Sequence, residues 1–230
     1  MDRFKRSTAG FSLVEMVVTL GVMVMIMAMT FANFPKIRDQ IALTLATREL
    51  ALSIRKAQSY AIGVREFDSS YPTNLCKLGY YEPTDGFVRY PPYGVALSKA
   101  PPAAPEEGND QFTYSIFGDI NCNAFLLQSP VYQSVSEFVS SVKIQNGAQI
   151  ATIKGYVSGS AIPEVLRSAQ IVYQRPTPSV TLVGTSNSGN GSCGNPTCIY
   201  TGRIEISLTS GNGLATQKVV VRPSGQISVE

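Results

Sequence analysis

The chain has 230 residues, of which 44% are hydrophobic and 15% are charged, and its formal net charge is +3. This length allows one domain with a sizeable core and a separate appendage, while the small net charge argues against a general electrostatic surface for nucleic acid. The sequence contains no histidine, which excludes Ser-His-Asp and Cys-His catalytic centres and histidine-ligated metal sites. We therefore expect a protein that is not an enzyme and that needs no cofactor.

A short, basic leader opens the chain, and a long apolar run follows it. Residues 16–35 carry no charge, and as a helix these 20 residues would span ~30 Å, the thickness of the hydrocarbon core of a bilayer. An ordinary secretory signal peptide cut near Ala32, or a simple membrane anchor, would contain a similar run. Both alternatives leave Glu15 unexplained, since a carboxylate costs about 2.5–3.5 kcal/mol at the centre of a bilayer, and less near its surface.

The residues around Glu15 form a specific pattern. Gly10-Phe11-Ser12-Leu13-Val14-Glu15 resembles the class III signal of type IV pilins and type II secretion pseudopilins. The resemblance implies that a prepilin peptidase cuts between Gly10 and Phe11 and that Phe11 is then N-methylated. It also implies that Glu15, at the fifth position of the mature chain, pairs with the terminal amine of a neighbouring subunit during assembly. Such a pair suits an apolar core, where a carboxylate needs an opposite charge.

The helix is predicted to continue past Pro35 and to stop at Gly63, because apolar residues recur at helical spacing. Together the two segments would form one helix of about 50 residues, or ~75 Å. The apolar stripe, which we expect to pack on a sheet, consists of Ile37, Ile41, Leu45, Leu50, Ile54, Ala57 and Ala61.

The rest of the chain is predicted to form strands, because short alternating runs are separated by Gly, Pro, Asn and Ser. Asn146-Gly147 indicates a hairpin, and Gly211-Asn212-Gly213 and Pro223-Ser224-Gly225 indicate further tight turns. The candidate strands are 94–97, 112–117, 139–145, 148–156, 169–174, 179–183, 200–208, 217–221 and 226–229.

The predicted fold class is α+β, with a long N-terminal α-helix packed on an antiparallel β-sheet head, as in the pilin fold. The first half of this helix would be transmembrane and the second half amphipathic. The expected organisation is a cleaved leader at 1–10, a transmembrane or filament-core helix at 11–35, its amphipathic continuation at 36–63 and a globular β-rich head at 64–230.

Four cysteines are expected to form disulfides outside the cytoplasm, since an even number accompanies an export signal. Cys193 and Cys198 lie close together in a loop and are expected to form one pair, with Cys76 and Cys122 as the other. Three pairings are possible for four cysteines. A four-thiolate zinc site is the alternative, but the usual short Cys-x-x-Cys spacing is missing.

A weak calcium motif lies in the head, where Asp119, Asn121 and Asn123 alternate as the oxygen ligands of a calcium loop do. Only one of the three side chains is charged, and Pro130 stands where the bidentate glutamate would be. A polar turn is therefore the favoured interpretation, and no metal is expected.

Parts of the head are similar to the GspH/FimT group of minor pilins and pseudopilins, namely Thr47–Arg65, Ile171–Pro176 and Val219–Val229. The resemblance implies a structural subunit that acts at a filament tip, in a type II secretion pseudopilus or a type IV pilus, and supports protein secretion. DNA-binding members carry a Gly-Arg-x-Arg ending, whereas this chain has Gly225-Gln226-Ile227-Ser228, so nucleic acid is not an expected partner.

The partners implied by the family are other pilin or pseudopilin subunits, the prepilin peptidase, an inner-membrane assembly platform and membrane lipid. The implied location is the cytoplasmic (inner) membrane, crossed once with the head on the extracytoplasmic side, and then an extracytoplasmic filament. Two alternatives stay open: a pilus subunit for adhesion or DNA uptake, and a membrane-anchored extracellular binding domain that never polymerises.

Overall fold

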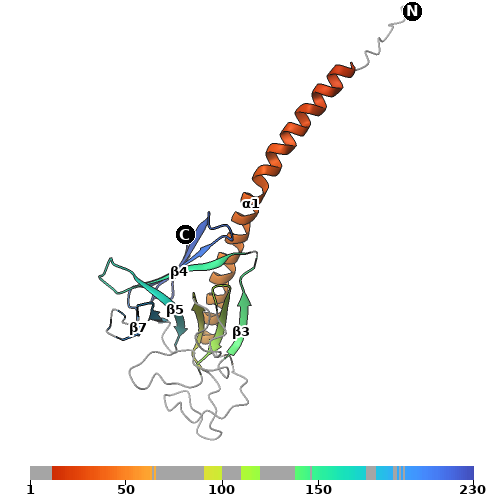
Figure 1. The fold of residues 1–230 in the computed structure, drawn as a ribbon. Coiled ribbons are helices and arrows are strands. Elements are labelled where there is room, and N and C mark those ends of the chain that lie inside the picture. Colours follow the sequence, from red (N-terminus) through yellow and green to blue (C-terminus); the bar gives the residue numbers. More distant parts are fainter. Residues whose placement is uncertain are drawn as a thin grey trace, which may run out of the picture. The chain divides into compact units, whose positions relative to one another are not determined.

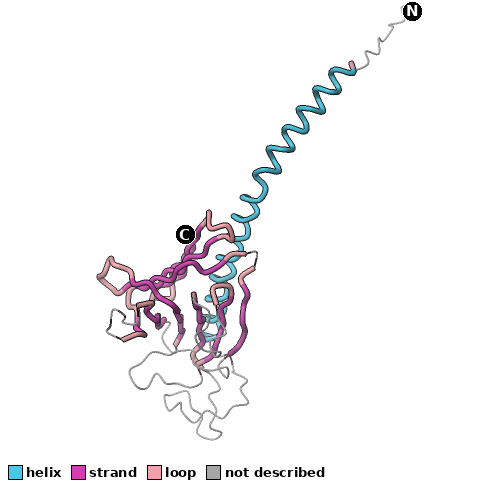
Figure 2. The backbone as a smooth tube through the Cα atoms, in the orientation of Figure 1, coloured by secondary structure: helices cyan, strands magenta, loops and turns pink. Residues whose placement is uncertain are grey.

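The computed structural model describes residues 12–63, 65, 91–99, 110–119, 138–145, 147–174, 180–188, 191, 193 and 195–230. Within these residues one long helix precedes an antiparallel sheet, so the α+β class is confirmed (Figures 1 and 2). The chain divides into two compact units, one ending at Arg38 and the other beginning at Asp39. Several predicted sites lie outside the described residues, namely Gly10, Phe11, Cys76, Cys122, Asn121 and Asn123.

The helix α1 (Leu13–Ile62) is 50 residues long and contains Pro35, so its predicted continuation past the proline is confirmed. Pro35 lacks the amide hydrogen of other residues, which removes one bond from the helical ladder. The helix ends next to Gly63, as predicted, and the Gly63 amide donates to the carbonyl oxygen of Ser59 at 2.8 Å.

From Asp39 onward, only one side of α1 is buried. Its buried side chains are Ala42, Leu43, Ala46, Thr47, Leu50, Ala51, Ser53, Ile54, Ala57 and Ala61. The prediction that Ile37, Ile41 and Leu45 join this stripe is wrong, because their side chains are 53%, 55% and 56% exposed. The step from Leu45 to Leu50 is five residues, which turns the helix by about 140°. The predicted stripe therefore combines two nearly opposite sides of the helix.

The described strands form one branched antiparallel sheet. Its main path runs β10-β9-β8-β4-β5-β1-β2-β3, and β6 pairs with β5 and β7. Each predicted strand overlaps a strand of this sheet, whereas β7 was not predicted. The bounds are β1 (Tyr93–Ser98), β2 (Thr113–Gly118), β3 (Phe138–Lys143), β4 (Gln149–Tyr156), β5 (Glu164–Tyr173), β6 (Val180–Ser186), β7 (Thr197–Ile199), β8 (Arg203–Thr209), β9 (Thr216–Val221) and β10 (Ile227–Val229).

The predicted hairpin at Asn146-Gly147 is wrong, because β3 pairs with β2 whereas β4 pairs with β5 and β8. The backbone before β2 keeps the two strands from pairing. The Ile144 amide donates to the carbonyl oxygen of Phe112 at 2.7 Å, and the Ile150 amide donates to that of Gln111 at 2.8 Å. Gly147 still occupies a turn, with a φ of +75° that favours glycine.

The strand β5 is the branch point of the sheet. One of its edges pairs with β6 from Leu166 to Tyr173. The other edge is divided, since Glu164–Leu166 pair with β4 and Ser168–Tyr173 pair with β1. Consequently β4 leads into one group of strands, β8-β9-β10, and β1 leads into another, β2-β3.

The buried side of α1 and the inner faces of both strand groups form one core. Its strand side chains include Val95, Leu97, Ile116, Ile150, Ile153, Ile204, Ile206, Leu208, Val219 and Val221. Polar contacts also attach the helix to the sheet. The hydroxyl groups of Ser53 and Tyr114 are 3.0 Å apart, and Gln217 Nε2 donates to Thr44 Oγ1 at 3.1 Å. Burial raises the pKa of the Tyr114 phenol to about 12, although its hydrogen bond with Ser53 lowers it.

A second feature of the core is the fit of Tyr200 against glycine. A Cβ atom added to Gly155 would lie 2.5 Å from the Tyr200 ring, and one added to Gly184 would lie 2.7 Å from it. The Tyr200 hydroxyl donates to Glu164 Oε2 at 2.7 Å. Both glycines therefore provide the space that the ring fills between β4 and β6.

Candidate functional site

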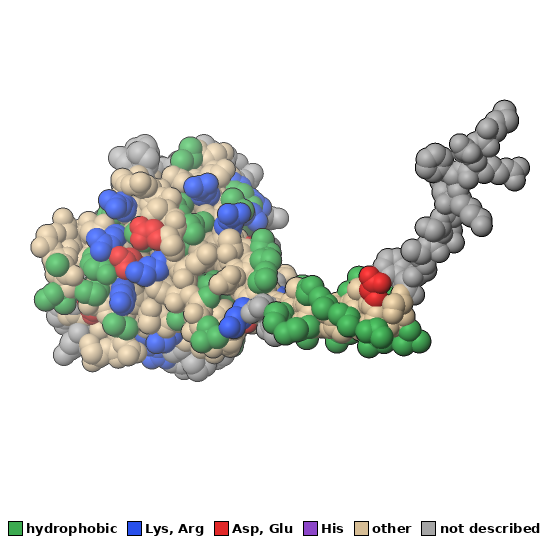
Figure 3. Space-filling model, turned by 90° about the horizontal axis from the view of Figure 1, so that it is seen from above, with side chains coloured by type: hydrophobic (Ala, Val, Ile, Leu, Met, Phe, Trp, Pro, Cys, Tyr) green, Lys and Arg blue, Asp and Glu red, His purple; other side chains and the backbone are tan. Residues whose placement is uncertain are grey.

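The N-terminal half of α1 is apolar on all sides. The large apolar side chains between Leu13 and Phe34 are between 53% and 80% exposed, and Figure 3 shows them along this part of the helix. A helix that is hydrophobic all round is typical of a membrane span or of the interior of a protein assembly. This helix is long and apolar enough to cross a membrane.

Glu15 is the one charged side chain in this apolar surface, since residues 16–35 carry none. It lies in the first turn of α1, near the amide groups at the helix start. A carboxylate is favourable there because the first amides of a helix have no carbonyl partner and carry partial positive charge. No described residue forms a salt bridge with Glu15.

Three large apolar side chains lie on the outward side of α1 beyond the spanning segment, among the exposed charged residues Arg48, Glu49, Arg55 and Lys56. Ile41, Leu45 and Leu52 are 55%, 56% and 62% exposed. They follow one another at four and seven residues, a spacing that keeps side chains on one side of a helix. We call these three residues the outer ridge. Sequence reasoning missed the outer ridge, although the four- and seven-residue spacing indicates that its three side chains share one side of the helix.

A cavity lies next to the outer ridge. It has a volume of about 170 Å³ and is lined by Ala42, Leu45, Ala46, Glu49 and Gln145. Its two alanines leave the space beside Leu45, and both are buried. A ridge beside a hollow is the surface shape by which helices pack, with the side chains of one helix filling the spaces of the other.

Comparisons with protein-family models, curated proteins and solved structures gave no match. Function is therefore inferred from the chain's own residues.

The predicted disulfide between Cys193 and Cys198 is present, with a Cα–Cα distance of 5.9 Å. It closes the turn before β7, where the Gly191 amide donates to the carbonyl oxygen of Asn195 at 2.8 Å. A Cβ atom at Gly191 would lie 2.6 Å from the Cys198 sulfur, so glycine permits this close turn. The disulfide is typical of a domain that folds outside the cytoplasm.

The calcium candidates cannot be assembled into a site from the described residues. Asp119 is buried directly after β2, where its amide donates to the carbonyl oxygen of Pro92 at 2.8 Å. The other two candidates, Asn121 and Asn123, lie outside the described part of the chain. The calcium motif stays a weak prediction.

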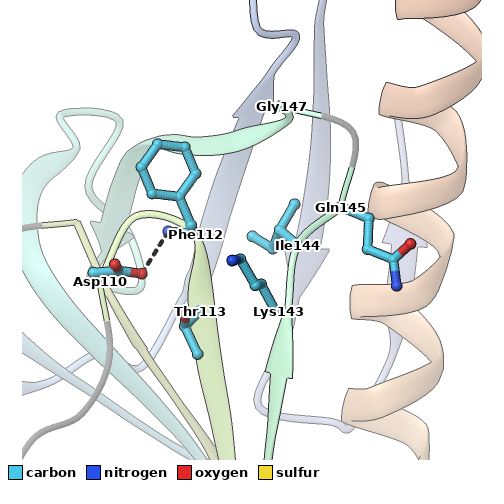
Figure 4. Close-up of a pocket in the computed structure, with 7 residues that line it drawn as sticks. All are labelled: Asp110, Phe112, Thr113, Lys143, Ile144, Gln145 and Gly147. Atoms are coloured by element: carbon cyan, nitrogen blue, oxygen red, sulfur yellow. Dashed lines mark hydrogen bonds between the residues drawn. The ribbon is translucent and has the colours of Figure 1, made fainter.

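A wider pocket of about 620 Å³ opens between the start of β2 and the end of β3 (Figure 4). Its described lining combines one carboxylate, Asp110, with one ammonium group, Lys143. Asp110 Oδ1 accepts the Phe112 amide at 2.8 Å, an Asx turn that shapes the backbone entering β2. Asp110 thus has a structural role here, and the outer ridge and the apolar helix are the stronger functional candidates.

Proposed function

We propose that this protein is a structural subunit of the minor pilin or pseudopilin type. A prepilin peptidase processes it, and it assembles into a type II secretion pseudopilus or a type IV pilus that supports protein secretion. The observation that carries the proposal is one carboxylate, Glu15, at the start of an exposed apolar helix directly behind the Gly10-Phe11 pair. The long helix packed on an antiparallel sheet supports a pilin-like fold.

The apolar helix has two successive surroundings in this proposal. It first anchors the subunit in the cytoplasmic membrane, with the head on the extracytoplasmic side. It then leaves the lipid and packs among the helices of neighbouring subunits, where its exposed side chains are covered again. Both surroundings are apolar, so the transfer requires little change in the free energy of solvation of these side chains.

Glu15 sets the position of each subunit in the filament. A carboxylate inside an apolar core costs several kcal/mol unless an opposite charge pairs with it. Cleavage after Gly10 would create such a charge, the α-amino group of Phe11. The amine of a subunit displaced along the filament axis would neutralise Glu15 of its neighbour, and only one axial displacement brings the two groups together.

The outer ridge extends the proposed contact surface into the head. Ile41, Leu45 and Leu52 are exposed on the side of α1 that faces away from the sheet. Apolar side chains of a neighbouring helix would cover them and fill the cavity beside Leu45. The subunit thus acts mechanically in this proposal, through contacts rather than through catalysis.

The mature N-terminus tests the proposal. The chain is produced together with a prepilin peptidase and its N-terminal peptide is analysed by mass spectrometry. We expect a peptide that begins with N-methylated Phe11, and we expect Gly10→Val to retain the leader. A chain that begins near Ala32, or that keeps Met1, would contradict the proposal.

A second experiment separates assembly from simple anchoring. Glu15→Ala removes the charge, and Glu15→Asp keeps it as a matched control. We expect Glu15→Ala to abolish cross-linking between subunits in cells while the protein still fractionates with membranes, and Glu15→Asp to retain part of the cross-linking. Equal cross-linking for all three proteins would favour a membrane-anchored binding domain that does not polymerise.

A further inference from the structure

The turn between β8 and β9 presents an exposed apolar side chain on a hydrogen-bonded backbone. Residues 210–215, Ser-Gly-Asn-Gly-Leu-Ala, carry no charge. Leu214 is 78% exposed. Among the described residues from Asp39 to Glu230, only Ile162 is a more exposed large apolar residue. A leucine held in water at the tip of an uncharged turn is a potential contact with an apolar partner.

The backbone of this turn is already hydrogen-bonded within the turn. The Gly213 amide donates to the carbonyl oxygen of Ser210 at 2.8 Å, and the Ser210 amide donates to that of Ala215 at 3.0 Å. The Leu214 amide donates to Asn212 Oδ1 at 3.0 Å, and the Ala215 amide donates to Ser210 Oγ at 3.2 Å. Unsatisfied peptide groups are the main obstacle to placing a loop in lipid, and here four amides already have acceptors.

The turn is attached to α1 close to the end of its apolar segment. Asn212 Nδ2 donates to Asp39 Oδ2, and the hydrogen bond between Gln217 and Thr44 holds the following strand on the same helix. Asp39 follows Phe34 by five residues. Five residues cover ~7.5 Å as a helix and at most ~18 Å fully extended.

The segment from Phe34 to Asp39, called the link below, also has the charges expected where a helix leaves a membrane. Lys36 and Arg38 lie between Phe34 and Asp39, and cationic side chains commonly anchor the ends of spanning helices among lipid headgroups. A headgroup layer is roughly 5–7 Å thick on each side of the hydrocarbon core. The helical length of the link therefore matches the depth of that layer.

We propose that the β8–β9 turn is a membrane-contacting loop, in which Leu214 inserts among the lipids of the same bilayer that α1 spans. The inference rests on the membrane anchoring proposed above. Its partner is a phospholipid surface, and its consequence is that the head has a fixed contact with the membrane before assembly. The subunit must break this contact when it enters a filament.

The turn between β4 and β5 supplies a matched comparison. Its Ile162 is 82% exposed, similar to Leu214. The two turns lie at opposite ends of the β4–β8 ladder, since Tyr156 pairs with Arg203 at one end and Gln149 pairs with Thr209 at the other. Seven residues of a strand cover ~23 Å. Ile162 therefore lies far from the contact between the β8–β9 turn and α1, and it serves as the comparison for Leu214.

The experiment uses the absence of tryptophan from the natural sequence. Three full-length variants, Leu214→Trp, Ile162→Trp and Met23→Trp, each introduce one fluorophore at an exposed position. Each variant is placed in phosphatidylcholine nanodiscs whose acyl chains are brominated either near the headgroup or near the chain end, and the loss of tryptophan emission is measured. Because tryptophan itself favours membrane interfaces, Ile162→Trp controls for that preference.

Met23→Trp should lose most emission with bromine near the chain end, which reports that the helix spans the bilayer. We expect Leu214→Trp to lose emission with bromine near the headgroup and Ile162→Trp to keep its emission in both nanodiscs. If Met23→Trp is quenched but Leu214→Trp behaves as Ile162→Trp does, the turn does not touch lipid and only this inference is overturned. If Met23→Trp is not quenched, the anchoring itself is wrong and the inference falls with it.

Discussion

Two leucines of α1 allow a test of the proposed assembly surface, because Leu45 belongs to that surface and Leu50 belongs to the core. They lie on the same helix but on nearly opposite sides, with 56% and 0% of their side chains exposed. Truncation to alanine removes the same atoms in both cases. Any difference in effect therefore reports the surroundings of the side chain.

The expected loss of stability differs strongly between the two variants. Leu50→Ala removes fully buried atoms and leaves a cavity, which costs about 2–5 kcal/mol. In a domain of this size that loss lowers Tm by roughly 4–20 °C. Leu45→Ala removes exposed atoms, so the free energy of unfolding should change by no more than about 0.5 kcal/mol.

For assembly we expect a direct effect of Leu45→Ala, the variant that leaves stability unchanged. Thermal unfolding of the full-length protein in detergent, followed by circular dichroism, measures stability. Cross-linking between subunits in cells measures assembly. We expect Leu45→Ala to reduce cross-linking without changing Tm, because a neighbouring subunit would lose a contact at the outer ridge. Normal cross-linking of Leu45→Ala, or a Tm as low as that of Leu50→Ala, would refute the assignment of the outer ridge.

Three further predictions concern the head. Gly155→Ala should lower the free energy of unfolding by about 1–3 kcal/mol, because the new methyl group overlaps the Tyr200 ring. Urea unfolding measures this change, and an unchanged free energy of unfolding would contradict the packing described. Replacing Cys193 and Cys198 by serine opens a loop of six residues and should cost about 2 kcal/mol, a loss that vanishes when the natural protein is compared under reducing conditions. Burial raises the pKa of Tyr114 to about 12 in the folded state, whereas the phenol has its usual pKa of about 10 in the unfolded state. The folded state therefore keeps the Tyr114 proton at higher pH than the unfolded state does. The stability due to this difference, about 2–3 kcal/mol, should be complete below pH 10 and be lost as the pH rises from about 10 to 12; in unfolding measured against pH, Tyr114→Phe should remove this part of the alkaline loss, and an unchanged profile would argue against it.

The sequence predicted the elements of this fold better than their arrangement. Strand positions follow from local alternation and turn residues, and each predicted strand is present. Pairing depends on distant segments, which is why the hairpin at Asn146-Gly147 was predicted wrongly. The residues that separate β3 from β4, Gln111 and Phe112, lie more than 30 positions before the turn, and no local pattern indicates their contact.

The candidate site was predicted in part. Glu15 and the apolar segment are visible in the sequence because charge and hydropathy change abruptly there. Two residues of the outer ridge, Ile41 and Leu45, were assigned to the core because apolar residues are expected to be buried. Their exposure follows from the phase of the helix, which the buried residues Leu43, Leu50 and Ile54 fix only once the sheet is in place.

The divided edge of β5 has a consequence for how the head opens. Every residue between Ser168 and Tyr173 has a strand on each side, β6 on one and β1 on the other, and its amide donates to one of the two. Neither flanking group can detach alone and leave β5 free, because the remaining neighbour still holds it. In hydrogen–deuterium exchange, this strand should be among the slowest to take up deuterium, because opening one flank exposes only the amides that donate to that side.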